Sequence, residues 1–232
     1  MKDTTQDTKA LQAHWTTLHR NPRHLLRHPS EVVIRWRHAH LPKPPKPTDH
    51  LLDIGSGSGR HTMFLANEGF AVDAIDIADS AINNLLQRTK GTNDRVRAKV
   101  RTADSLDDFE TERFTGVVCY GVYTYMSETA ILDSLAHVRR VLKPGGTFLL
   151  VVRAHNDWRS KHGTNLSSGR LYADNLAGTP AESENKLTMT LPNRAQLNSW
   201  LRDFSKAEID LETWTTDGGR YINVDWHATA TC

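Results

Sequence analysis

The sequence predicts an α/β protein with a doubly wound, mainly parallel sheet of seven strands. We expect an antiparallel hairpin at its C-terminal end and a helical cap at its N-terminus. Between residues 48 and 152, short apolar segments alternate with segments of helical periodicity, the pattern of parallel strands joined by crossover helices. After residue 204, two alternating segments flank Asp217-Gly218-Gly219, which is typical of a hairpin turn.

The first 47 residues are expected to form a helical cap and a proline-rich joint. A helix over residues 8–19 would place Leu11 and Trp15 on one face, and Ser30 is the candidate N-cap of a second helix. Four prolines between residues 41 and 47 then exclude a helix or a central strand. We interpret this segment as the joint to the main domain.

Residues 48–232 are expected to form the main domain. Its predicted strands cover residues 50–54, 71–75, 96–102, 116–120, 147–152, 208–215 and 221–229, and its predicted helices cover 60–68, 79–89, 129–142 and 193–204. The segment 143–146, Lys-Pro-Gly-Gly, is a predicted turn. Residues 154–186 break the alternation, because they are polar, rich in Gly, Ser and Asn, and without a clear period. A stretch of this length is often a lid or a substrate-binding loop.

Composition excludes several classes of protein. The 232 residues contain 29 Lys and Arg against 27 Asp and Glu, and this near balance argues against a dedicated nucleic-acid or polybasic membrane binder. The two cysteines give no disulfide framework, and no apolar run approaches the roughly 18 residues that span a bilayer. We therefore expect a cytoplasmic protein without a membrane segment, either a monomer or a homodimer. A basic excess among the first 50 residues is either a solvated arm or a surface that attracts an anionic group.

A glycine-rich turn joins the first predicted strand to the first helix of the main domain. Gly55, Gly57 and Gly59 would let the backbone approach a ligand closely, and the helix N-terminus adds free N–H groups. Asp76 ends the next strand, where a carboxylate can accept both hydroxyl protons of a ribose. Together these features indicate a cofactor of the adenosine type.

The spacing of the glycines separates the possible cofactor classes. A dinucleotide site of the G-x-G-x-x-G type would need glycine or alanine at the position of Arg60. A phosphate-binding P-loop would need Gly-Lys followed by Ser or Thr, and the sequence contains no such triplet. The glycines instead follow Asp53 with G-x-G-x-G spacing.

Residues 48–152 resemble the class I S-adenosylmethionine-dependent methyltransferases. The likeness rests on the glycine-rich turn, on Asp76, and on the segments 103–106, 119–123 and 140–146. It implies a Rossmann-like fold, S-adenosylmethionine as the cofactor and S-adenosylhomocysteine as the product. No metal is expected, because Glu128 is alone where a metal site would need a cluster of acids after the fourth strand. The sequence departs from the family at Phe114-Thr115-Gly116, where Phe-Asp is frequent, and at Tyr125, where many members have histidine.

The resemblance also implies which residues bind the cofactor. The glycine turn would contact its amino-acid part, Asp76 its ribose, Ile77 the adenine ring and Asp104 the adenine amino group. The complete predicted set is Trp15, which would close over the cofactor, with Asp53, Gly55, Ser56, Gly57, Gly59, Asp76, Ile77, Asp104, Ser105, Cys119 and Tyr120.

Methyl transfer requires a positioned nucleophile and a group that takes its proton. Such groups should follow the fourth and fifth strands. His155 is the candidate base because its ordinary pKa is near neutral, with Asp157 and Tyr123 as further catalytic candidates. The candidate substrate residues are Tyr125, Arg153, Trp158, Arg170 and Tyr172. For each, a role in loop structure or packing is the alternative, and His61 is expected on a helix surface.

Three functions remain open from the sequence. The favoured one is transfer of a methyl group from S-adenosylmethionine to an O or N atom of a small molecule, such as a sugar or a secondary metabolite. Methylation of RNA or DNA gains from the basic residues 20–46 but lacks an Asn-Pro-Pro-Tyr or Pro-Cys motif. A non-catalytic cofactor-binding module is the third.

Overall fold

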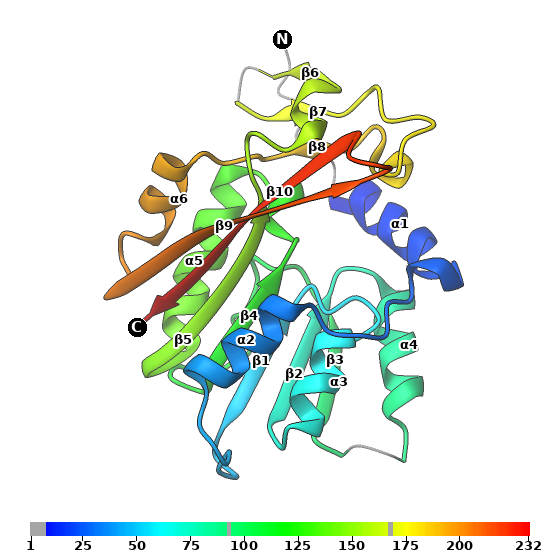
Figure 1. Cartoon of the computed structure of the whole chain (residues 1–232). Coiled ribbons are helices and arrows are strands. Elements are labelled where there is room, and N and C mark those ends of the chain that lie inside the picture. Colours follow the sequence, from blue (N-terminus) through cyan, green and yellow to red (C-terminus); the bar gives the residue numbers. More distant parts are fainter. Residues whose placement is uncertain (1–7, 92–93, 167–168) are drawn as a thin grey trace.

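The computed structural model describes residues 8–91, 94–166 and 169–232 (Figure 1). Its α-helices are α1 (Thr8–His19), α2 (Glu31–His40), α3 (Arg60–Asn67), α4 (Asp79–Thr89), α5 (Glu128–Val141) and α6 (Arg194–Leu201). Its strands are β1 (His50–Ile54), β2 (Ala71–Asp76), β3 (Val96–Val100), β4 (Phe114–Tyr120), β5 (Leu142–Arg153), β6 (Thr164–Asn165), β7 (Leu171–Tyr172), β8 (Thr188–Met189), β9 (Lys206–Thr216) and β10 (Tyr221–Thr231). Short 3₁₀ turns are η1 (Pro22–His24), η2 (Tyr123–Tyr125), η3 (Trp158–Lys161) and η4 (Glu182–Glu184).

The main sheet has seven strands in the order β3-β2-β1-β4-β5-β10-β9. Strands β1 to β5 pair in parallel, whereas β10 pairs antiparallel with both β5 and β9. The predicted fold class is therefore confirmed. The strand order reverses at β1, between β2 and β4, and ligands of open α/β sheets bind in the crevice that such a reversal creates at the carboxyl ends of the strands.

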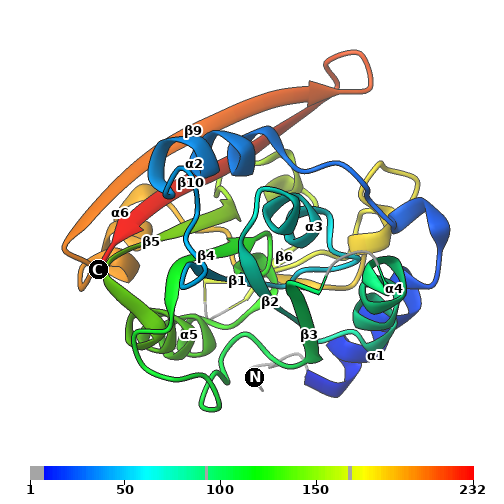
Figure 2. The ribbon, with the colours of Figure 1, turned by 90° about the horizontal axis from the view of Figure 1, so that it is seen from below.

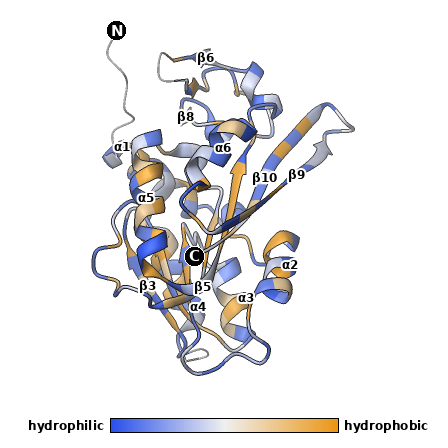
Figure 3. Cartoon of the chain, turned by 90° about the vertical axis from the view of Figure 1, so that its left-hand side faces the viewer, coloured by the Kyte–Doolittle hydropathy of each residue, from blue (hydrophilic) through white to orange (hydrophobic). Residues whose placement is uncertain are grey.

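Helices cover both faces of this sheet (Figure 2). On one face, α2 and α3 pack against Leu51, Val72 and Val151. On the other face, α5 and α6 pack against a larger core that includes Phe148 and Leu150. Figure 3 shows hydrophobic residues concentrated on the central strands and on the helix sides that face them. Strand β5 is thus buried on both faces, as its apolar sequence predicts.

The N-terminal residues form two separate packing units. Helix α2 belongs to the sheet, because the Trp36 Nε1–H donates to Thr147 Oγ1 at 3.2 Å and Arg37 pairs with Glu68 at 3.1 Å. Helix α1 lies beyond the carboxyl ends of the strands, beside α4 (Figure 1). The hydroxyl of Ser80 donates to the Thr16 carbonyl at 2.7 Å, which ties α1 to α4. Only α1 is placed to cover a ligand at that edge.

Two predicted segments differ from the structure. The predicted turn at residues 143–146 lies inside β5 as an irregularity, since the register with β4 shifts between Phe114 and Gly116. Residues 154–186 contain regular structure, because β7 pairs antiparallel with β6 and with β8 in a small sheet, and η3 and η4 lie in the same stretch. These strands have two residues each, too few for a visible period. We call residues 154–186, the stretch predicted as a lid, the lid segment.

Candidate active site

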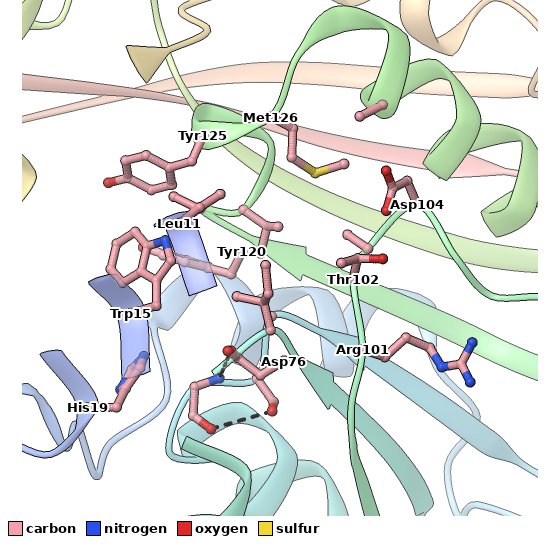
Figure 4. A pocket seen from close by; sticks show the side chains of 18 of the residues that line it. Leu11, Trp15, His19, Asp76, Arg101, Thr102, Asp104, Tyr120, Tyr125 and Met126 are labelled. Atoms are coloured by element: carbon pink, nitrogen blue, oxygen red, sulfur yellow. Dashed lines mark hydrogen bonds between the residues drawn. The ribbon is translucent and has the colours of Figure 1, made fainter. Parts of the chain in front are cut away.

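A cavity of about 590 Å³ lies at the carboxyl ends of the central strands, beneath α1 and the lid segment (Figure 4). Its volume is typical of sites that hold a small ligand. The predicted residues that line it are Trp15, Gly55, Ser56, Gly57, Asp76, Ile77, Asp104, Tyr120, Tyr125, Arg153 and Arg170. The structure therefore brings together residues from α1, from the ends of four strands and from the lid segment.

The glycine turn needs its glycines for two reasons. Gly55 has a φ of +71°, and a Cβ on it would lie 2.0 Å from Val122 Cγ2. The N–H groups of Gly55 and Ser56 both donate to the Ile75 carbonyl, at 2.8 and 3.0 Å. These bonds hold the turn against the end of β2, so that its backbone borders the cavity without a side chain in the way.

Asp76 is positioned by the turn that it faces. Its Oδ2 accepts from the Gly57 N–H and its Oδ1 from the Ala78 N–H, both at 2.8 Å. A carboxylate has about four acceptor positions, so capacity for a ligand's hydroxyl groups is left. Burial raises the pKa of Asp76, while these two bonds and the nearby His19 oppose the rise. The side chain borders the cavity, as the ribose-binding prediction requires.

Other predicted cofactor residues lie outside the cavity lining. Asp53 is fully buried behind the turn, where Thr62 donates to its Oδ2 at 2.5 Å, and burial raises its pKa to about 6. Gly59 packs instead against α4, because a Cβ on it would lie 2.3 Å from Leu85 Cδ1. Ser105 and the buried Cys119 also stay outside the lining. These residues support the site's framework rather than border the ligand.

His61 corrects a prediction. It was expected on a helix surface, but its side chain is buried and borders the cavity. Its ring packs on Tyr120 with centroids 5.0 Å apart, and its Nε2 has no hydrogen-bond partner among the described residues. Burial lowers the pKa of His61 to about 3, so the ring is neutral at physiological pH. Arg60 stacks on the same Tyr120 ring at 4.9 Å.

Helix α1 forms one wall of the cavity, and only part of that wall was predicted from the sequence. Trp15, a predicted residue, meets Tyr125 edge-on with ring centroids 4.9 Å apart. His19 was missed, although its imidazole lies within 3.3 Å of the position that a Cβ on Gly57 would occupy. The stripe Leu11-Trp15 was the available signal, and one further turn of that helix reaches His19. Other lining residues that were missed include Thr8, Leu26, Arg101, Thr102, Val122, Met126 and Ala130.

The structure does not bring the predicted catalytic residues to the cavity. Tyr123 is fully buried, and its hydroxyl donates to Ser134 Oγ at 2.8 Å. His155 is exposed and lies outside the lining. Asp157 is fully buried and accepts from the Arg159 guanidinium at 3.0 Å and from the Val224 N–H at 3.1 Å. These contacts give Asp157 a structural role at the end of β5.

Two predicted substrate residues also lie apart from the cavity. The Nε1–H of Trp158 donates to Asn223 Oδ1 at 3.2 Å, and the ring packs on Tyr221. Tyr172 belongs to β7, where it pairs with Thr164 and Thr188. Both residues build the small sheet's core or strands, whereas Tyr125, Arg153 and Arg170 line the cavity.

The described residues also bear on membrane and metal sites. In residues 8–91, 94–166 and 169–232, no helix has the length and apolarity to cross a membrane. Across the same ranges, no three His, Cys, Asp or Glu side chains are grouped as metal ligands.

The sheet order, with the antiparallel β10 between β5 and β9, is that of the Rossmann-like methyltransferase fold, and a glycine turn faces an acid at the end of β2. Residues 51–146 match the family described as "Methyltransferase domain".

Curated relatives match over part of their length. A ubiquinone biosynthesis O-methyltransferase of Paramagnetospirillum magneticum is 34% identical over 99 residues, which are 43% of this chain and 38% of that protein. The sterol 4-C-methyltransferase strm-1 of Caenorhabditis elegans is 27% identical over 124 residues, 52% of this chain and 36% of that protein. The chain therefore spans less than half of the length of these relatives.

Solved structures share the fold over more of the chain. A SAM-dependent methyltransferase from Methanosarcina mazei has a TM-score of 0.68 at 24% identity, covering 88% of this chain and 98% of that one. Geranyl diphosphate C-methyltransferase from Streptomyces coelicolor, solved with S-adenosylhomocysteine, has a TM-score of 0.66 at 14% identity, covering both chains fully. At such identities the likeness establishes the fold.

Proposed function

We propose that this chain binds S-adenosylmethionine in the cavity and transfers its methyl group to an O or N atom of a small molecule, releasing S-adenosylhomocysteine. The observation that carries the proposal is the joint position of the glycine turn and Asp76, which border one cavity and are hydrogen-bonded to each other at 2.8 Å. The matched methyltransferase domain, residues 51–146, contains both.

The residues present fit an adenosyl cofactor. The turn presents peptide backbone to the cavity, since Gly57 has a φ of +52° and a Cβ on it would come within 3.3 Å of His19 Cε1. The Asp76 carboxylate suits ribose hydroxyls, and Ile77 and Asp104 border the cavity where an adenine ring would lie. The unpartnered Nε2 of His61 offers a polar contact near the turn.

The bound cofactor would supply an electrophilic methyl group on a sulfonium centre. The chain's own residues would orient the two reactants and exclude water. The Trp15 and Tyr125 rings form an aromatic wall, which also suits a cationic sulfonium. Helix α1 and Arg170 of the lid segment line the site, so the acceptor would be held in place between them. Positioning is therefore the main contribution of the chain to the rate.

The size of the cavity supports a small acceptor rather than a polymer. Its volume of about 590 Å³ is that of a small-molecule site, and residues of α1 and Arg170 of the lid segment narrow it. Several structural neighbours carry names of small-molecule enzymes, including the phosphoethanolamine N-methyltransferase 2 of Haemonchus contortus, with a TM-score of 0.64 at 17% identity. We therefore retain the small-molecule acceptor in the proposal.

Calorimetric titration tests the cofactor, with S-adenosylmethionine and S-adenosylhomocysteine as ligands and NAD⁺ as the control. We expect the two adenosyl ligands to bind with one site per chain and NAD⁺ not to bind. Formation of S-adenosylhomocysteine with candidate acceptors then tests turnover. Failure of both adenosyl ligands to bind would refute the proposal, whereas binding without turnover across a broad acceptor panel would favour a non-catalytic module.

A further inference from the structure

One part of the cavity is lined by apolar and aromatic side chains together with two arginines. We define the acceptor half by Leu11, Trp15, Tyr125, Arg153 and Arg170, which line the cavity from α1, η2, the end of β5 and the lid segment. Figure 4 shows Leu11, Trp15 and Tyr125 grouped on the side away from Asp76. Apolar and aromatic walls thus meet two guanidinium groups in the same space.

Both guanidinium groups are held in fixed positions. The Arg153 Nη1 lies 2.8 Å from Glu184 Oε2 and 3.4 Å from the Tyr125 hydroxyl. The Arg170 side chain is buried, with its Nε donating to Thr190 Oγ1 at 3.0 Å. Because these side chains are already ordered, a ligand that contacts them loses little additional side-chain entropy.

The carboxylates near Arg153 do not line the cavity. Glu184 and Asp157 lie 2.8 and 3.9 Å from the Arg153 guanidinium, and Asp225 is the residue of β10 that stands in register with Arg153 of β5. Among the described residues, these three acids are absent from the cavity lining, and the acids that do line it, Asp76 and Asp104, lie with the predicted cofactor groups. An acceptor therefore meets guanidinium and phenol donors at this end, without a carboxylate facing it.

We propose that the acceptor is a small molecule with a flat, apolar body and a carboxylate, the body lying against Trp15 and Tyr125 and the carboxylate against Arg153 and Arg170. A planar guanidinium matches a carboxylate in shape as well as in charge. This inference rests on the proposed function in one respect, namely that the bound molecule receives the methyl group. Binding of a carboxylate in the acceptor half does not depend on that function. Arg170 is then a specificity-determining residue, because it comes from the lid segment and closes over the carboxylate.

Paired probes test the inference. 2-Naphthoate and 2-naphthamide share one shape and differ in charge, and each is titrated by calorimetry into the protein with and without saturating S-adenosylhomocysteine. We expect naphthoate to bind at least tenfold more tightly than the amide. The variant Arg170→Gln should lose most of that preference while keeping its affinity for S-adenosylhomocysteine, which shows that it is folded. The matched control is Arg220→Gln, an exposed arginine at the β9–β10 turn, which should behave as the parent.

The outcomes separate this inference from the proposed function. Equal affinity for the two probes, no binding of either, or an unchanged preference in Arg170→Gln would each overturn the carboxylate assignment. If naphthoate is preferred and Arg170→Gln removes the preference, but S-adenosylhomocysteine fails to bind, the arginine site stands and the cofactor proposal falls.

Discussion

The Asp76 carboxylate acts on both the protein and the proposed ligand. Its two oxygens hold the N–H groups of Gly57 and Ala78, which fixes the glycine turn and the start of α4. The same carboxylate borders the cavity. A substitution at this residue therefore changes the shape of the site as well as its chemistry.

We predict that Asp76→Ala weakens binding of S-adenosylhomocysteine at least tenfold and lowers the free energy of unfolding by about 1–2 kcal/mol. The first effect follows from the lost ribose acceptor and the second from two unpaired N–H groups. Calorimetric titration and urea unfolding measure them. Asp79→Ala, three residues away and exposed, is the matched control. Unchanged affinity in Asp76→Ala would contradict the ribose role.

His155 illustrates why a base was hard to predict. The sequence places it directly after β5, but the path of the chain there depends on Asp157, which is drawn inward by Arg159 and the Val224 N–H. His155 itself is exposed and lies outside the cavity lining. Long-range contacts of this kind leave no local pattern in the sequence.

We predict that His155→Ala retains turnover within about twofold of the parent, because a group outside the cavity cannot reach the acceptor's proton. Initial rates of S-adenosylhomocysteine formation measure this, once an acceptor is known. Tyr125→Phe is the comparison, since it removes a hydroxyl that lies in the cavity beside Arg153. A large loss in His155→Ala alone would restore the histidine as the base.

Asp53 makes stability depend on pH. Burial raises its pKa to about 6 from an ordinary value of 3.8, so the folded state binds a proton more tightly than the unfolded state. The contribution of Asp53 to the free energy of unfolding is then most favourable below about pH 4, and it is lost as the pH rises through about 6. We predict that Asp53→Asn, which is uncharged at every pH, gains stability relative to the parent by roughly 2 kcal/mol between pH 4 and pH 7.5. Urea unfolding at both pH values measures the difference, and a constant difference would contradict it.

At the scale of elements, α1 is the least securely packed part of the site. None of its residues is fully buried, yet Trp15 and His19 border the cavity. Side-chain bonds from α4 help to hold it, Ser80 Oγ to the Thr16 carbonyl and Asn84 Nδ2 to the His19 carbonyl at 3.0 Å. A ligand beneath α1 leaves most easily when this helix moves.

We predict that Ser80→Ala combined with Asn84→Ala raises the dissociation rate of S-adenosylhomocysteine about thirtyfold, since two hydrogen bonds of about 1 kcal/mol each no longer hold the cap. Stopped-flow tryptophan fluorescence follows the release, because Trp15 lines the cavity. Asn83→Ala, exposed on the same helix, is the control and should leave the rate unchanged. An unchanged rate in the double variant would show that α1 does not gate release.

The elements that were predictable share strong local signals. Helix α4 has its predicted bounds, residues 79–89, because an apolar stripe is bracketed by polar ends. Strand β1 likewise matches, since an apolar run ends at a glycine turn. By contrast, β6, β7 and β8 have two residues each and exist through contacts between Trp158, Leu171 and Met189, which are distant in sequence. No periodicity could have revealed them.

At the scale of the whole molecule, the site arises from topology as much as from motifs. The reversal of strand order at β1 opens the crevice, and the glycine turn and Asp76 occupy it because they end adjacent strands. The cofactor side was therefore predictable from sequence. The acceptor side joins α1 to a segment more than 130 residues later, and only the folded chain shows that Trp15 and Arg170 share one cavity.

A cavity built from such distant segments makes folding and binding depend on each other. We predict that S-adenosylhomocysteine at 100 times its dissociation constant stabilises the chain by about 2.7 kcal/mol and raises the melting temperature by about 5–10 °C. Calorimetric melting measures this, with NAD⁺ at equal concentration as the ligand control and Asp76→Ala as the protein control. NAD⁺ should give little shift, and Asp76→Ala should give about half of the parent's shift or less, since a tenfold loss of affinity leaves about 1.4 kcal/mol of stabilisation. A shift with NAD⁺ as large as that with S-adenosylhomocysteine would mean that the crevice recognises the adenosine moiety without discriminating the amino-acid end, and the glycine turn would then lose its proposed role in cofactor selection.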